Sequence, residues 1–95
     1  MVFGLDLSGR MAVVTGAGGI LCGMFARTLA QAGASVALLD INLETAERTA
    51  REIRAQGGNA AAYEVDVMDK DRLEGVHARV LADLGPCDIL INGAG

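Results

Sequence analysis

The sequence of 95 residues lacks several features that mark particular classes of protein. Its most apolar run, residues 34–39, is far shorter than the ~20 residues that a membrane-spanning helix needs. Lysine and arginine together number 8 against 12 acidic residues, and the net charge of −4 argues against a nucleic-acid surface. Residues 1–6 contain neither a basic segment nor a long apolar one, so we expect no secretory signal. These absences predict a chain that binds neither membranes nor nucleic acid.

Cysteine and proline are also scarce, whereas glycine is abundant. Cys22 and Cys87 are far apart in the sequence, with no cluster of metal ligands around them. We therefore expect reduced thiols, a cytoplasmic location and no metal site. One proline accompanies 13 glycines, which gather at positions 16, 18, 19 and 23 and again at 93 and 95. Clustered glycine between apolar segments indicates that the backbone approaches something closely.

Apolar residues follow two alternating periods along the chain. Continuous apolar runs, typical of strands buried on both faces, occur at residues 11–14, 36–39 and 89–91, with a weaker run at 62–65. Between these runs, apolar residues recur at helical spacing. Asn42 and Asp69 are the expected N-caps of the second and third helices, and Gly33 is expected to end the first.

The resulting order, βαβαβαβ, predicts an α/β fold with a parallel sheet and right-handed crossovers. Residues 1–95 are long enough for one domain and too short for two. The pattern fits either half of a doubly wound fold or a very small complete one. In residues 1–95 taken alone, the fourth strand, at residues 89–91, would form an edge of the sheet with unpaired N–H and C=O groups.

A glycine-rich segment, residues 15–23 (Thr-Gly-Ala-Gly-Gly-Ile-Leu-Cys-Gly), lies between the first predicted strand and the first helix. A turn at this place directs backbone N–H groups and the positive end of the helix dipole into a crevice where a pyrophosphate can bind. Glycine suits such a turn because a Cβ would hold the phosphate away from the backbone. The alternative is a glycine-rich turn that serves only helix–strand packing.

Two acidic residues end predicted strands. Asp40 follows the second strand at about the offset from the loop at which an acid accepts hydrogen bonds from adenosine ribose hydroxyls. Its alternative role is a strand-end turn or a cap for the next helix. Asp66 ends the third strand and could contact an adenine amino group, but turns favour aspartate in any case. We interpret His77 as a boundary residue and the dispersed methionines, Met68 among them, as packing residues.

Three segments together resemble a known family. Thr15-Gly16 opens the loop, Asp66-Val67 follows the third strand, and residues 88–95 read Asp-Ile-Leu-Ile-Asn-Gly-Ala-Gly. In this order and spacing they resemble the short-chain dehydrogenases/reductases, whose fourth strand ends in Asn-Asn-Ala-Gly. The resemblance covers the whole chain and implies the N-terminal half of a doubly wound Rossmann fold, so that residues 1–95 would be an incomplete dinucleotide-binding domain.

The chain departs from the family pattern at three positions. The pattern Thr-Gly-x-x-x-Gly-x-Gly would place glycines at 20 and 22, where this sequence has Ile20 and Cys22. Gly93 stands where the family has its second Asn. The variant loop, together with residues 85–88, is similar to a subgroup described as mannonate oxidoreductase or fructuronate reductase-like.

The resemblance implies NAD as the cofactor and assigns its contacts. The pyrophosphate would lie against the loop, the ribose against the end of the second strand, the adenine against the end of the third, and the inner part of the cofactor against the end of the fourth. In that order the implied residues are Gly16, Gly18, Gly19, Ile20 and Leu21; Asp40 and Ile41; Asp66 and Val67; and Asn92, Ala94 and Gly95.

The family's catalytic Ser, Tyr-x-x-x-Lys and Asn have no counterpart here and would follow residue 95 in a full-length member, so no catalytic residue is assigned. By resemblance, the full-length protein would be an NAD-dependent oxidoreductase and a homo-oligomer. Its small-molecule substrate would be a sugar acid or another hydroxyl or carbonyl compound. Residues 1–95 alone would be inactive.

Two other functions fit parts of the pattern. An S-adenosylmethionine-binding methyltransferase half also uses a glycine loop and an acid at the end of the second strand, although Thr15-Gly16 and residues 92–95 (Asn-Gly-Ala-Gly) speak against it. A nonenzymatic nucleotide-binding or assembly module remains open, because the residues that would decide are not in this sequence.

Overall fold

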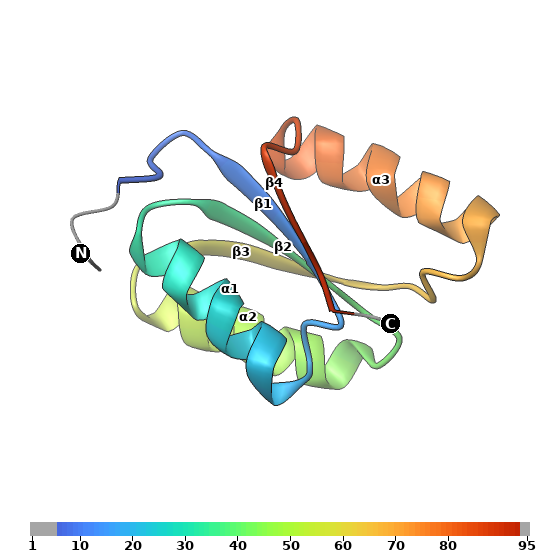
Figure 1. Cartoon of the computed structure of the whole chain (residues 1–95), viewed down its shortest axis with the longest axis horizontal. Helices are drawn as coiled ribbons and strands as arrows, with labels where there is room; N and C mark the ends of the chain where they lie inside the picture. Colours follow the sequence, from blue (N-terminus) through green and yellow to red (C-terminus); the bar gives the residue numbers. More distant parts are fainter. Residues whose placement is uncertain (1–5, 94–95) are drawn as a thin grey trace.

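A computed structural model describes residues 6–93 and shows a parallel sheet between two helical layers (Figure 1). The predicted βαβαβαβ order is confirmed. Helices α1 and α2 cover one face of the sheet, and α3 lies on the other (Figure 1). The elements are β1 (Met11–Thr15), α1 (Ile20–Gln31), β2 (Ser35–Asp40), α2 (Leu43–Ala55), β3 (Asn59–Glu64), α3 (Lys70–Leu84) and β4 (Ile89–Asn92).

The strands pair in the order β3-β2-β1-β4, and every pairing is parallel. The chain therefore moves outward from β1 to β3 and then returns, through α3, to the opposite side of β1. This reversal creates a switch point at the carboxyl ends of β1 and β4, the place where open α/β sheets bind ligands. Thr15 at the end of β1 is paired with Leu39 on one side and Asn92 on the other, so three strands end at one level.

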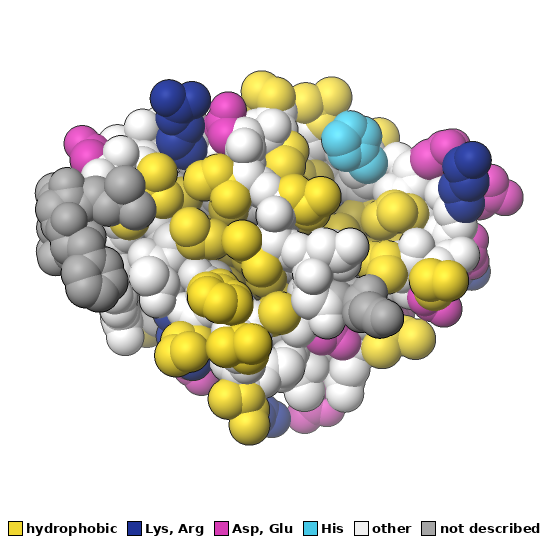
Figure 2. All heavy atoms as spheres, in the orientation of Figure 1, with side chains coloured by type: hydrophobic (Ala, Val, Ile, Leu, Met, Phe, Trp, Pro, Cys, Tyr) yellow, Lys and Arg dark blue, Asp and Glu magenta, His cyan; other side chains and the backbone are white. Residues whose placement is uncertain are grey.

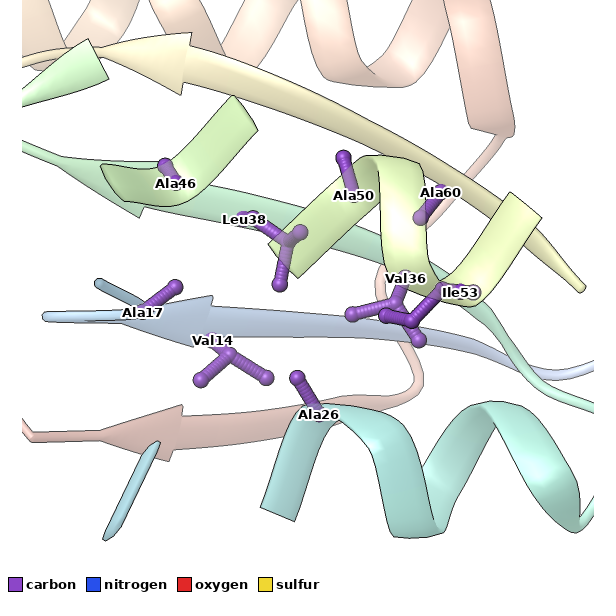
Figure 3. Close-up of a cluster of buried hydrophobic side chains, with 9 residues drawn as sticks. All are labelled: Val14, Ala17, Ala26, Val36, Leu38, Ala46, Ala50, Ile53 and Ala60. Carbon is purple, nitrogen blue, oxygen red and sulfur yellow. The ribbon is translucent and has the colours of Figure 1, made fainter. Parts of the chain in front are cut away.

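Small and β-branched side chains fill the layer between the sheet and helices α1 and α2 (Figure 3). Val14, Val36 and Leu38 are the largest side chains with no exposed surface, and each contributes roughly 1.5–3 kcal/mol by burial. Alanines of both helices, among them Ala26 and Ala50, contact these strands and let the helices approach closely. The continuous apolar runs of β1 and β2 follow from this burial on both faces.

The predicted helix ends are confirmed in their geometry. Asn42 Oδ1 accepts hydrogen bonds from the N–H groups of Glu44 and Thr45, at 3.1 and 3.5 Å. Asp69 Oδ1 accepts from the Arg72 N–H at 3.3 Å. Gly33 has φ +105° directly after the C-cap of α1, the left-handed conformation that favours glycine at this position.

Two expectations about individual residues were wrong in detail. Strand β3 begins at Asn59, three residues before the predicted apolar run, because Asn59 pairs with Ser35 as soon as Gly57 and Gly58 end α2. The early part of β3 is rich in alanine, whose small side chain gives little strand signal. Met68 does not pack in the core; it is 86% exposed.

Strand β4 is an edge strand of the described sheet, as predicted. Asp88 fixes its start, because the Asp88 carboxylate accepts a hydrogen bond from the Met11 N–H at 3.0 Å and the Asp88 N–H donates to the Met11 carbonyl at 2.9 Å. Hydrophobic side chains gather over β4 and the neighbouring helix face in Figure 2. The exposed ones include Leu90 of β4 and Ile20, Leu21, Met24 and Phe25 of α1.

None of the helices within residues 6–93 is both long and apolar enough to cross a membrane. Cys87 is an exposed free thiol and Cys22 a partly buried one.

Tyr63 connects the edge strand β3 to α3. Its ring is buried, its hydroxyl donates a hydrogen bond to Asp83 Oδ2 at 2.7 Å, and the Arg79 guanidinium lies 5.2 Å from the ring centre. Burial, assisted by the hydrogen bond and the negative charge of Asp83, raises the pKa of Tyr63 to about 12, and nearby Arg79 opposes this shift. The phenolic proton is therefore held more tightly in the folded chain than in the unfolded one.

This proton should make stability depend on alkaline pH. Below about pH 10 Tyr63 is protonated in both states and its contribution is complete; between about pH 10 and about 12 the unfolded state loses the proton first, so the free energy of unfolding falls. Tyr63→Phe should lose about 1 kcal/mol at neutral pH and lack this component of the alkaline fall. Urea unfolding of both chains across this range measures the difference. Equal pH profiles would contradict the prediction.

Candidate functional site

A pocket of about 370 Å³ lies at the carboxyl ends of β1, β2 and β3. The parallel register brings these strand ends and their following loops to one edge of the sheet. Five of the residues that the sequence assigned to cofactor binding line this pocket, together with Leu39, Val65 and Met68: Gly16, Asp40, Ile41, Asp66 and Val67.

The start of α1 differs from the starts of the other two helices. Asn42 caps α2 and Asp69 caps α3 with side-chain hydrogen bonds, and each helix has an acid in its first turn. Gly19 caps α1 without any side-chain hydrogen bond, and the first turn of α1 contains no acid. The first N–H groups of an α-helix have no partner within the helix, and its N-terminus carries a partial positive charge. The chain thus leaves this end of α1 free to bind an anion.

Asp40 joins the glycine loop to the pocket. Its Oδ2 accepts a hydrogen bond from the Gly18 N–H at 2.7 Å, and its Oδ1 accepts one from the Asn42 N–H at 2.8 Å. The second bond is the strand-end turn considered as the alternative role. The first bond holds the loop against the end of β2. A carboxylate has about four acceptor positions, so these two bonds leave capacity for further donors, such as ribose hydroxyls.

The glycine at position 18 is explained by packing within the chain. A Cβ at Gly18 would overlap the Thr45 hydroxyl and would lie 2.8 Å from Thr45 Cβ and 2.9 Å from Asp40 Oδ2. Gly16 is explained by its conformation, because its φ of +66° is left-handed. The sequence interpretation gave phosphate approach as the reason for the glycines. The structure adds loop–helix packing as the reason at Gly18.

Asp66 forms a local turn at the rim of the pocket. Its Oδ1 accepts a hydrogen bond from the Met68 N–H at 2.9 Å, and the residue is exposed. This turn places the exposed side chain of Met68 along the wall. Met68 and Val65 are therefore lining residues that sequence analysis did not identify. Their only signal was their position on either side of Asp66-Val67.

The predicted pyrophosphate residues form the loop and the first turn of α1. Ile20 is 93% exposed and Leu21 58%, so their side chains are not held in the core. The Gly19 N–H donates to the Gly16 carbonyl at 3.0 Å and closes the turn before the helix. The N–H groups of Ile20 and Leu21 belong to the first turn of α1, where backbone N–H groups have no acceptor within the helix.

Asn92 lies on the other side of the switch point. The Thr15 hydroxyl donates a hydrogen bond to Asn92 Oδ1 at 2.9 Å and accepts one from the Gly93 N–H at 3.1 Å. This arrangement fastens the end of β4 to β1. Ala94 and Gly95, which the sequence also assigned to the cofactor, lie outside the described residues.

A second hollow, of about 650 Å³, opens on the α3 side of the sheet. Thr15 and Asn92 line it at the strand ends, and the rest of its wall is mainly apolar, with Leu39, Leu73 and Leu90. His77 lines it from α3, where it is exposed rather than packed in the helix seam. The two hollows share Leu39, Val67 and Met68 as lining residues, so they adjoin each other at the carboxyl ends of the strands.

The four parallel strands and three helices form the N-terminal portion of a Rossmann-like α/β fold. This fold is typical of nucleotide-binding proteins. The model of the short chain dehydrogenase family matches residues 10–95, which is nearly the whole chain. The chain therefore belongs to the short-chain dehydrogenase family.

The chain is similar to individual members of this family. It is 44% identical over 90 residues to an uncharacterised oxidoreductase of Haemophilus influenzae, covering 95% of this chain and 32% of that protein. A crystal structure from the same species, provisionally assigned as a D-mannonate oxidoreductase and containing bound NAD, has 44% identity and a TM-score of 0.93, and covers 96% of this chain and 32% of its own. A metagenomic short-chain oxidoreductase with bound NADP has 39% identity and a TM-score of 0.83, with coverage of 88% and 38%.

The chain spans about a third of the length of the curated relatives it matches. The third of their length that this chain matches contains the glycine loop, the 370 Å³ pocket and the ends of four strands.

Gly18→Ala should destabilise the fold by roughly 1–3 kcal/mol, because the new methyl overlaps Thr45 and crowds Asp40. The matched control is Gly75→Ala on α3, where a Cβ would meet nothing within 4 Å and alanine should be neutral or stabilising. Chemical denaturation of the two variants and the parent measures the difference. Equal stability of both variants would show that the loop or Thr45 rearranges without cost to accommodate a Cβ at position 18.

Proposed function

We propose that this chain is the NAD-binding N-terminal part of a short-chain oxidoreductase, an incomplete Rossmann domain whose catalytic residues belong to the remainder of a longer protein. The observation that carries the proposal is the uncapped start of α1 beside a pocket that holds Asp40. The family membership supports it, as does the NAD bound in the similar structure from Haemophilus influenzae.

The proposed binding mode uses each part of the site for one part of the dinucleotide. The backbone N–H groups of Gly19, Ile20 and Leu21, at the start of α1, would bind the pyrophosphate. Asp40 would accept hydrogen bonds from the ribose hydroxyls while it keeps its bond to the Gly18 N–H. The adenine would occupy the 370 Å³ pocket, between Ile41 and Val67 with Asp66 at the rim.

The inner half of the cofactor would pass the other strand ends. Asn92, fixed by the Thr15 hydroxyl, would orient it where β4 ends, and Ala94 and Gly95 would follow. When bound, the nicotinamide supplies hydride transfer. The residues of this chain would bind and orient the cofactor, and the proton transfers would belong to residues outside it.

The activity of the whole protein is part of the same proposal. We propose a cytoplasmic homo-oligomer that oxidises or reduces a hydroxyl or carbonyl group of a small molecule, with a sugar acid as the first substrate class to test. The provisional assignment of the Haemophilus influenzae structure to a mannonate oxidoreductase supports that choice. Relatives that carry the names of other dehydrogenases match the same segment, so this segment does not by itself select the substrate.

Isothermal titration with NADH tests the proposal directly, and S-adenosylmethionine is the comparison ligand because the methyltransferase hypothesis predicts it instead. We expect saturable NADH binding and no saturable binding of S-adenosylmethionine. The opposite order of affinities would reject the dinucleotide site.

The site should prefer NADH to NADPH, because the Asp40 carboxylate accepts from a 2′-hydroxyl and repels a 2′-phosphate. Asp40→Asn keeps an acceptor for the Gly18 N–H but removes the charge. Asp40→Asn should weaken NADH binding by about tenfold and reduce the difference between the affinities for NADH and NADPH. Glu44→Gln is the control, because it removes an exposed charge at the start of α2 that does not line the pocket. Tighter binding of NADPH than NADH by the parent chain would contradict the assignment.

Residues 1–95 alone should show no dehydrogenase turnover, because the sequence contains neither the family's Tyr-x-x-x-Lys motif nor a residue assigned as its acid/base group. The measurement is NADH formation or consumption with sugar acids and simple alcohols, on a preparation already shown to bind NADH. Turnover that follows the chain through independent purification steps would overturn this expectation.

A further inference from the structure

Two positions at which the sequence departs from the family pattern face each other in space. Cys22, the third residue of α1, stands where the pattern has glycine, and Gly93, directly after β4, stands where it has asparagine. A Cβ built at Gly93 would overlap Cys22 Sγ and would lie 3.6 Å from Cys22 Cβ. The thiol thus occupies the space into which any side chain at position 93 would begin.

The restriction at Gly93 is steric. Gly93 is not among the described glycines with positive φ, so the backbone conformation itself does not require glycine. The carbonyl oxygen of Thr15 would also lie 3.1 Å from the added Cβ. That oxygen cannot move independently, because β1 is the central strand and Thr15 is paired with both Leu39 and Asn92.

Hydrogen bonds fix Gly93 from the side of β1. The Gly93 N–H lies 3.1 Å from the Thr15 hydroxyl and 3.3 Å from the Thr15 carbonyl. Cys22 is partly buried and packs against the core cluster that includes Val14 and Ala26. Gly93 therefore lies between a fixed strand and a packed thiol, and the thiol belongs to the same helical turn that begins at Ile20.

We infer that Cys22 and Gly93 form one packing unit that sets how closely the start of α1 approaches the end of β4, and that Cys22 thereby positions the N-terminus of α1 for the pyrophosphate. The second part rests on the proposed function. Cys22 is a positioning residue in this scheme, because it acts through the helix start and does not itself bind phosphate. The two departures from the pattern depend on each other. The Cys22 thiol fills the space that a side chain at position 93 would occupy, and glycine at position 93 leaves that space open.

A double-mutant cycle tests the coupling. Gly93→Ala alone should force the thiol or the helix start to shift, and should lower the unfolding midpoint and weaken NADH binding by about tenfold. Cys22→Ala removes only the sulfur, and leaves its Cβ at an ordinary 3.6 Å from the new methyl. The Thr15 carbonyl oxygen would still lie 3.1 Å from the new methyl, so the double variant should recover most but not all of the loss and bind NADH within about threefold of Cys22→Ala. Gly75→Ala is the matched control and should behave as the parent.

The outcomes separate the coupling from the proposed function. Additive effects of the two substitutions on the unfolding midpoint would overturn the coupling, whether or not NADH binds. A parent chain that fails to bind NADH while the midpoints show rescue would reject the dinucleotide site and retain the packing unit. If Gly93→Ala does not fold, folding of the double variant is the rescue, and failure of both rejects the pair.

The rate at which Cys22 is alkylated provides a second measurement, because a purely structural contact between Cys22 and Gly93 would not make this rate depend on NADH. Saturating NADH should slow the alkylation of Cys22 by iodoacetamide about tenfold, because a bound pyrophosphate holds the first turn of α1 closed over Gly93. Cys87 is exposed and lines the second hollow rather than the 370 Å³ pocket, so its rate is the internal reference for any general effect of NADH. Mass spectrometry of the two peptides measures both rates in one sample. An unchanged Cys22 rate at saturating NADH would overturn the positioning role.

Discussion

The parallel pairing of β1 with both of its neighbours is the constraint on which the rest of the site depends. It places Thr15, Leu39 and Asn92 at one level, so that the loops after β1, β2 and β4 leave the sheet together. The glycine loop can then reach Asp40 on one side, while the Thr15 hydroxyl reaches Asn92 on the other. A shift of one residue in either pairing would turn every side chain of that strand to the opposite face and would separate these groups.

The three helix starts show a division of roles that follows from simple electrostatics. Asn42 accepts hydrogen bonds from two of the first N–H groups of α2, and Asp69 accepts one from the first turn of α3. The first turns of these helices also carry Glu44 and Asp71. Their positive ends are thus already neutralised by the chain itself. Helix α1 alone among the three begins with glycine and no acid, so its end retains the field that attracts an anion. The positive N-terminal ends of α2 and α3 therefore contribute to stability through their caps and acids, whereas the N-terminal end of α1 has no such partner.

The sequence was sufficient for those parts of the structure that depend on local chemistry. The caps at Asn42 and Asp69 and the helix end at Gly33 could be predicted because each acts within a few residues. The gathering of Gly16, Asp40 and Asp66 at one pocket could also be predicted, because strand ends in a parallel sheet meet at one edge. The start of β3 at Asn59 could not, since alanine-rich strands carry no alternating pattern and the pairing with Ser35 is a long-range contact. The contacts of Gly18 with Thr45, and of Gly93 with Cys22, were equally invisible, because they join residues whose proximity only the packed helices create.

In residues 1–95 taken alone, the edge position of β4 has a consequence for how the sheet opens. Strand β2 is paired on both sides and its apolar residues from Val36 to Leu39 are buried, whereas β4 has one partner and an exposed Leu90. Amide hydrogens of β2 should therefore exchange with solvent only on global unfolding, and those of β4 through cheaper, local separation from β1. Asn92 and Gly93, which are hydrogen-bonded to the Thr15 hydroxyl, lie on the part of the sheet that separates first. A molecule bound across β1 and β4 would raise the free energies of this local opening and of global unfolding by the same amount, because neither opened state could bind it.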